Sequence, residues 1–188
     1  FSSTGYSSSI FTLDISNFDT SNVTNMGSMF ASTGYNNPTF TLDVSNFDTS
    51  KATNMQSMFE NTGYNSENFT LDVSNFDTSN VTSMSSMFEN TGYNSENFTL
   101  DVSNFDTSNV MYMGRMFNGT GYNSTKFITS ITIKNPKTTS YSAMFRDVAT
   151  KNGSQITVNY TSETSALVDK MIATKSSNSN VIKGVQVD

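Results

Sequence analysis

The side chains best suited to chemistry are aspartates that return at one fixed interval. Four of them follow one another at equal spacing along the chain: Asp14, Asp43, Asp72 and Asp101. Two neighbouring carboxylates form the catalytic pair of most glycoside hydrolases, and carboxylate oxygens are also ligands of Ca²⁺. Acid and base roles need two environments that push the pKa values apart, whereas repeated copies share one environment. We therefore expect an exposed, non-catalytic row, and we expect that the chain is not an enzyme.

Other reactive groups are missing from the composition. The 188 residues contain no cysteine and no histidine. This excludes thiolate chemistry, disulfides, and the commonest general base and metal ligand. The sequence also lacks an oxygen-rich loop of the Asp-x-Asp-x-Asp-Gly type. We expect no cofactor and no dedicated metal site, and Ca²⁺ stays open only as a counter-ion of the aspartate row.

The aspartates belong to a repeat that covers most of the chain. Phenylalanine returns at the same interval as the aspartates, at Phe1, Phe30, Phe59, Phe88 and Phe117. A fixed period in the range of about 20 to 50 residues is typical of a solenoid, in which each unit buries its apolar face against its neighbours. Because the first residue already lies inside a repeat, we expect the sequence to be a fragment of a longer protein that lacks earlier repeats and any signal sequence.

Each repeat combines two apolar spacings. From Phe40 to Val44 the apolar residues alternate with polar ones, which is the period of a half-buried strand. From Ala52 to Phe59 the spacing becomes three and four residues, which predicts a short helix, and Gly63 supplies a left-handed residue after it. We therefore predict an α/β repeat, a leucine-rich-repeat-like solenoid of about 29-residue units. Each unit contains a short parallel strand, a turn and a short helix.

Stacked strands, about 4.8 Å apart, turn the repeated outward residues into rows. Rows of threonine and serine flank the aspartate row on the expected strand face. Adjacent like charges destabilise a sheet, so hydration, a basic partner or a bound cation must balance the charge, and these three alternatives stay open. We select this polar strand face as the candidate partner-binding site. Its residues are Thr12, Asp14, Ser16, Thr41, Asp43, Ser45, Thr70, Asp72, Ser74, Thr99, Asp101 and Ser103.

Three other repeated columns have structural interpretations. Met55, Met58 and their equivalents share a face with the phenylalanines, so we expect them to fill the core between stacked units. Asn46 and its equivalents follow the strand, where we expect the amide to bond the backbone of the adjacent turn. Asp48 and its equivalents are expected to accept hydrogen bonds from the amides that follow them.

The repeat pattern loosens after residue 126. Phe145 follows Phe117 at a shorter distance than the one that separates the earlier phenylalanines. Terminal units of solenoids are atypical because they must cover the open core. We therefore divide the chain into repeat solenoid over residues 1–126 and a degenerate repeat with a C-terminal α/β cap over residues 127–188.

Three elements are expected in this cap. Ile156 to Tyr160 alternates as a strand, and a last strand is expected from Val181 to Val187. Between them we predict a helix with Ser162 as its N-cap. The apolar face of this helix is predicted to contain Ala166, Leu167, Met171 and Ile172.

Charge is divided unevenly along the chain. Residues 1–114 contain twelve acidic residues and one lysine, whereas residues 115–188 contain nine basic and four acidic residues. An acidic array repels phosphate backbones, so we expect no nucleic-acid partner. The sequence has no run of about 18 apolar residues, and we predict no transmembrane segment within it.

The repeat also carries a resemblance. The string Leu-Asp-Val-Ser-Asn-Phe-Asp-Thr-Ser-Asn-Val-Thr-x-Met-x-x-Met-Phe, from Leu71 to Phe88, closely resembles the repeat of BspA-like bacterial surface proteins, leucine-rich-repeat relatives grouped with mycoplasma lipoproteins. One departure is a threonine where that family usually has a cysteine after Met-Phe. The resemblance covers residues 1 to about 117 well and the degenerate unit that ends at Met144-Phe145 in part. It implies an extracellular protein, on the bacterial cell surface or secreted, that acts as an adhesin toward a host or cell-surface protein or glycan. The alternative is a stalk that holds another domain away from the cell and recognises nothing.

Overall fold

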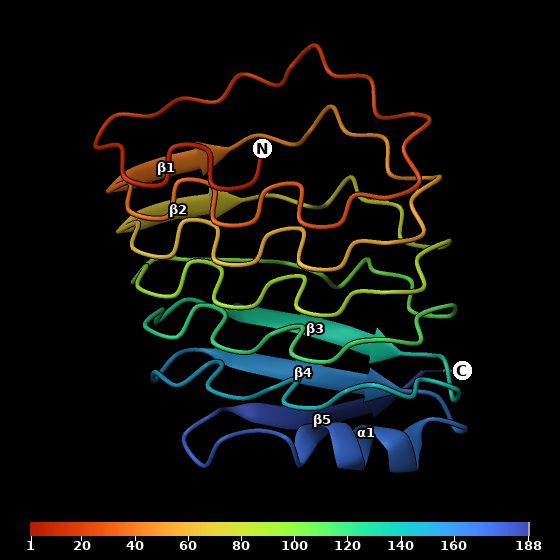
Figure 1. Ribbon diagram of the computed structural model, residues 1–188. Coiled ribbons are helices and arrows are strands. Elements are labelled where there is room, and N and C mark those ends of the chain that lie inside the picture. Colours follow the sequence, from red (N-terminus) through yellow and green to blue (C-terminus); the bar gives the residue numbers. More distant parts are fainter. Residues whose placement is uncertain (188) are drawn as a thin grey trace.

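A computed structural model describes residues 1–187 of the chain. The polypeptide winds into a β-solenoid whose successive turns lie on top of one another, from the N-terminal repeat to the C-terminal end (Figure 1). Its regular elements are β1 (Thr39–Leu42), β2 (Asn68–Leu71), β3 (Ile128–Ile133), β4 (Gln155–Tyr160), α1 (Ser165–Ile172) and β5 (Val181–Gln186). The predicted repeat solenoid is thus confirmed, whereas its helical part is not.

The strands pair in parallel with a register of one repeat. Phe40 of β1 lies beside Phe69 of β2, and β3, β4 and β5 form a second parallel sheet in that order. In β1 and β2 the burial alternates along the strand, as the apolar and polar alternation predicts. The matching segments around Phe11 and Phe98 are not regular strands, although both rings stack on their neighbours, 5.7 Å from Phe40 and 5.6 Å from Phe69.

The short helix predicted in each repeat is wrong, and consecutive turns replace it. Ser57 and Asn61 have φ values of 55° and 57°, in the left-handed region that an α-helix excludes. Every second N–H group of this segment bonds outside its own repeat. Those of Ser57 and Phe59 donate to carbonyls of the next turn of the solenoid, each at 2.9 Å. The N–H of Met58 instead closes a tight turn onto Met55 at 3.2 Å. The neighbouring repeat therefore takes the hydrogen bonds that a helix would have kept within itself.

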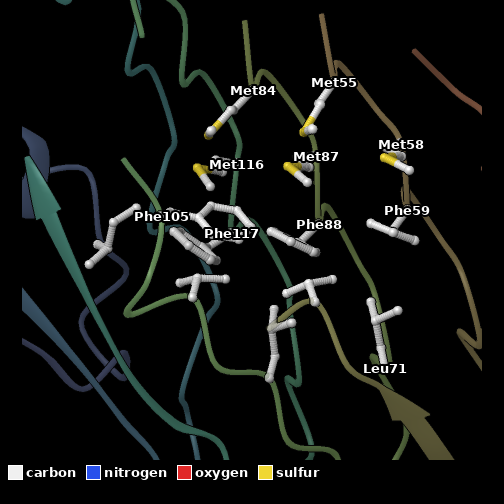
Figure 2. Packing of buried hydrophobic residues seen from close by; sticks show 14 of the residues in the cluster. Met55, Met58, Phe59, Leu71, Met84, Met87, Phe88, Phe105, Met116 and Phe117 are labelled. Atoms are coloured by element: carbon white, nitrogen blue, oxygen red, sulfur yellow. The ribbon is translucent and has the colours of Figure 1, made fainter. Parts of the chain in front are cut away.

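The core is built from the repeated apolar columns. Phe59 and Phe88 are fully buried, and their rings stack at 5.7 Å with an interplanar angle of 5°. Figure 2 shows Met55, Met58 and their equivalents above these rings, each row running along the stack. Met55 and Met58 have no exposed surface, which confirms that methionine fills the core.

The C-terminal end of the stack contains the one α-helix among residues 1–187. In Figure 1, α1 lies beyond β5 at the blue end. Its N-cap is Thr164, not the predicted Ser162, because the Thr164 side chain bonds back to the carbonyl of Ile133 at 2.7 Å and so positions the start of the helix. Its buried residues are Val168 and Met171.

The predicted apolar face of α1 therefore needs correction. Ala166 is exposed and Leu167 and Ile172 are half-buried, because a short helix laid across the end of the stack buries one narrow stripe. The strands expected around Ile156 and Val181 are present as β4 and β5. Residue 188, the last of the predicted cap, lies outside the described residues, and the division of the chain at residue 126 stays a prediction. No helix in the described chain is long and apolar enough to cross a membrane.

Candidate functional site

The twelve predicted partner-binding residues all lie on the surface. Every one of them is exposed, and they belong to the same segment of successive turns. The register of β1 and β2 places Thr41 beside Thr70, so the row of threonines continues from turn to turn. Because side chains of a strand alternate between its two faces, Asp43 points outward while Leu42 and Val44 are buried.

Two hollows extend along this face. The larger has a volume of about 550 Å³, and both polar and apolar residues of successive turns line it, with Asp43, Asp72 and Asp101 among the polar ones. A smaller hollow of about 290 Å³ shares Asp43 with it and reaches Asp14. Together the two hollows border all four aspartates of the row, and we call this surface the groove. Thr12 and Ser103 are exposed but line neither hollow.

An isoleucine marks one end of the larger hollow. Ile128 is 67% exposed and lines the groove beyond Thr99. It follows Phe127 as Thr99 follows Phe98, so it occupies the threonine row in the next turn. Its apolar side chain gives the groove two chemically different parts, acidic along the repeats and apolar at this end. The change from threonine to isoleucine was visible in the sequence, but only the structure shows that this isoleucine lines the groove.

Each aspartate of the row is held by the serine two residues later. The backbone N–H of Ser45 donates to Asp43 Oδ1 at 2.9 Å, and Ser74 does the same to Asp72. Hydrogen bonds from the Ser45 hydroxyl and then its N–H hold the pKa of Asp43 below its ordinary value of 3.8. The pKa of Asp72 is lowered in the same way, with the N–H of Ser74 as the largest cause, while the neighbouring Asp43 opposes it. These carboxylates are therefore preorganised anions.

The asparagine and second aspartate columns have the structural roles that the sequence predicted. Asn75 donates to three carbonyls of the preceding turn, those of Val44, Ser45 and Phe47, at 3.2, 3.3 and 2.9 Å. Asp48 Oδ1 accepts from the N–H two residues on, at 2.9 Å. These side chains join and shape the turns, and Asn75 and Asn46 also line the larger and the smaller hollow.

Two further columns of stacked side chains lie on the return loops, and the sequence did not predict them. The rings of Tyr35 and Tyr64 stack at 4.7 Å, and the side chain of Asn65 donates to that of Asn36 at 2.6 Å. The repeated Gly-Tyr-Asn tripeptide was the available signal. Within residues 1–187, no group of three or more carboxylates is arranged to hold a metal ion.

A comparison with known families matches the chain over most of its length. The family described as "Mycoplasma protein of unknown function, DUF285" matches residues 2–91 and residues 35–160. No curated protein and no solved structure gives a significant match.

Proposed function

The chain belongs to the DUF285 family, described as Mycoplasma proteins of unknown function. From the groove we propose that it is a binding module of the bacterial cell surface. In this proposal the acidic strand face binds a host or cell-surface protein or glycan. The observation that carries this proposal is the pair of hollows that border the exposed aspartate row and share Asp43. A concave surface with convergent polar groups is the usual form of a binding site.

The electrostatics of the groove favour a partner with basic or hydrogen-bonding groups. Successive aspartates are about 4.8 Å apart, well within the Debye length of about 10 Å at 0.1 M salt, so their fields add. The serine hydrogen bonds on Asp14 and Asp43 lower both pKa values and keep these two carboxylates ionised. A basic partner relieves the repulsion between these carboxylates and gains affinity from it.

The proposed location follows from the repeat. We infer that the protein is related to BspA-like surface proteins, on the string from Leu71 to Phe88, and that it is an adhesin on the outside of the cell or secreted from it. The family match supports a mycoplasma-type repeat and says nothing finer.

We further propose that the module is not an enzyme. Asp14, Asp43 and Asp72 all have pKa values lowered by a serine two residues later. An acid and base pair needs carboxyl groups with opposed shifts, whereas these share one direction and one cause.

The experiment is a binding screen of the purified chain against immobilised glycans and extracellular matrix proteins. Replacing Asp43, Asp72 and Asp101 together with Asn is expected to weaken binding and its salt dependence, because three charges of the groove are lost. A matched control removes three exposed charges away from the groove, with Glu67→Gln, Glu96→Gln and Glu163→Gln. Equal binding by the two triple variants would remove the strand face from consideration.

The alternative function is a spacer, and the hydrogen bonding of the stack favours it. Successive turns are bonded both along the strand side, as at Phe40 and Phe69, and along the turn side, as at Asn54 and Ser83. Two bonded sides resist bending, which suits a stalk. The test replaces this segment of the whole protein with an unrelated solenoid of equal length. Retained cell attachment supports the spacer and contradicts the binding module.

A further inference from the structure

A column of tyrosines stacks along the return loops of the solenoid. Its members are Tyr6, Tyr35, Tyr64, Tyr93 and Tyr122. Successive ring centroids are 4.6, 4.7, 4.8 and 4.7 Å apart, and the interplanar angles are 13°, 3°, 6° and 2°. We call these five residues the tyrosine ladder. Neighbouring rings lie in near-parallel contact, at the closer end of the range for aromatic pairs.

The backbone on both sides of each ring fixes this contact. The N–H of Gly63 donates to the carbonyl of Thr33 at 3.1 Å, and that of Asn65 donates to the carbonyl of Tyr35 at 2.8 Å. Tyr64 lies between these two bonds and cannot drift along the stack without breaking them. At the C-terminal end of the ladder, the ammonium of Lys151 lies 5.5 Å from the centre of the Tyr122 ring.

The ladder is also open to one-electron oxidation. The chain has no cysteine and no tryptophan, so two of the most easily oxidised side chains are absent. Its methionines are largely enclosed, and Met55 and Met84 have no exposed surface. In contrast, Tyr6 is 43% exposed and Tyr35 is half-buried. Oxidants in the surrounding water therefore reach phenol rings before thioethers.

We propose that the tyrosine ladder is a site of oxidative cross-linking, in which tyrosines of successive turns join as dityrosine. A one-electron oxidant, such as a peroxidase supplied with hydrogen peroxide, takes one electron and the phenolic proton from each of two stacked rings. A carbon–carbon bond then forms between their ortho carbons. The two ortho hydrogens move to the phenolic oxygens and restore both aromatic rings. The pair has lost two electrons and two protons, which reduce one peroxide to two waters.

The protonation state of the rings is consistent with this chemistry. Burial, with the neighbouring tyrosines as a further cause, raises the pKa of Tyr35, and burial likewise raises that of Tyr93. Both rings therefore remain neutral phenols near neutral pH and lose the electron together with the proton. The bond joins two turns of the solenoid and closes a loop of one repeat, which restricts the unfolded chain as a disulfide does. The cross-linked protein should therefore melt at a higher temperature.

The test treats the purified chain with a plant peroxidase and hydrogen peroxide. The expected result is dityrosine fluorescence on a monomeric protein, a raised Tm, and peptide mapping that joins neighbouring ladder residues, such as Tyr64 and Tyr93. The variant Tyr35→Phe with Tyr93→Phe keeps the stacked rings but leaves the remaining ladder phenols two turns apart. It should lose the intramolecular dityrosine signal. Tyr112→Phe removes an exposed tyrosine outside the ladder and should keep it.

Other results overturn the proposal. These are an absence of dityrosine in the wild-type chain, cross-links that join only separate molecules, or a signal that survives in the double variant. Circular dichroism of the untreated variants checks that both phenylalanine substitutions keep the fold, and the peptide map of the wild-type chain decides the question without any variant.

Discussion

Replacing Gly63 with alanine tests how the turns of the solenoid are positioned. Gly63 has a φ of 58°, and a Cβ placed there would lie 2.6 Å from Cγ of Phe69. An L-residue in the left-handed region costs about 1 to 2 kcal/mol. The ring of Phe69 is buried and stacked at 5.6 Å on both Phe40 and Phe98, so making room for the methyl group costs about 1 to 3 kcal/mol more.

The expected net effect of Gly63→Ala is a large loss of stability. Alanine restricts the unfolded chain and returns about 0.4 to 1 kcal/mol, which leaves a loss of about 1 to 4.6 kcal/mol. This loss is a substantial part of the free energy of unfolding of a typical domain, which is roughly 5 to 15 kcal/mol. Urea unfolding followed by circular dichroism measures the change, with the slope against urea checked for constancy between variants.

Two comparisons separate the causes of this loss. Gly114 has no left-handed φ, and its nearest neighbour is the movable hydroxyl of Ser140 at 3.1 Å, so Gly114→Ala should stay within about 0.5 kcal/mol. In a Phe69→Ala background, which removes the ring atoms that the new methyl group would meet, the cost of Gly63→Ala should fall to the backbone part less the return from the unfolded chain, about 0 to 1.6 kcal/mol. Equal losses at Gly63 and Gly114 would refute the reasoning, and an unchanged cost in the Phe69→Ala background would refute the part assigned to the ring.

Two further predictions follow from the polar columns. Asn75→Ala should destabilise the chain by about 1 to 2 kcal/mol, because carbonyls of the preceding turn lose their donor. Thermal unfolding measures this difference, with Asn97→Ala, at an exposed position, as the control. Ser45→Ala should move the pKa of Asp43 back toward 3.8, as followed by carboxyl NMR, since the Ser45 hydroxyl is the largest cause of its depression. The pKa of Asp43 is lower in the folded than in the unfolded chain, so the ionised carboxylate stabilises the fold above pH 3.8. This stabilisation is lost as the pH falls through the lowered pKa. The Ser45→Ala variant should therefore lose less stability in acid than the wild type.

The sequence by itself determined the repeat, the core and the exposed face. Identical residues in successive repeats must occupy identical environments in a stack, so alternation around Leu42 was enough to bury it and to expose Asp43. The left-handed glycine at Gly63 and the carbonyl-bonding role of Asn75 followed from residue type in the same way.

The tertiary structure alone decided where the backbone hydrogen bonds go. Apolar residues from Ala52 to Phe59 have helical spacing, and all of them are buried, yet the chain there is a series of turns. Burial spacing reports which side chains face inward, and a ribbon of turns meets that requirement as well as a helix does. What excluded the helix was a carbonyl of the next turn within reach of each second N–H, as between Phe59 and Met87 at 2.9 Å. The tyrosine ladder has the same origin, because contacts between rings that lie a whole repeat apart in the sequence depend on how the loops stack.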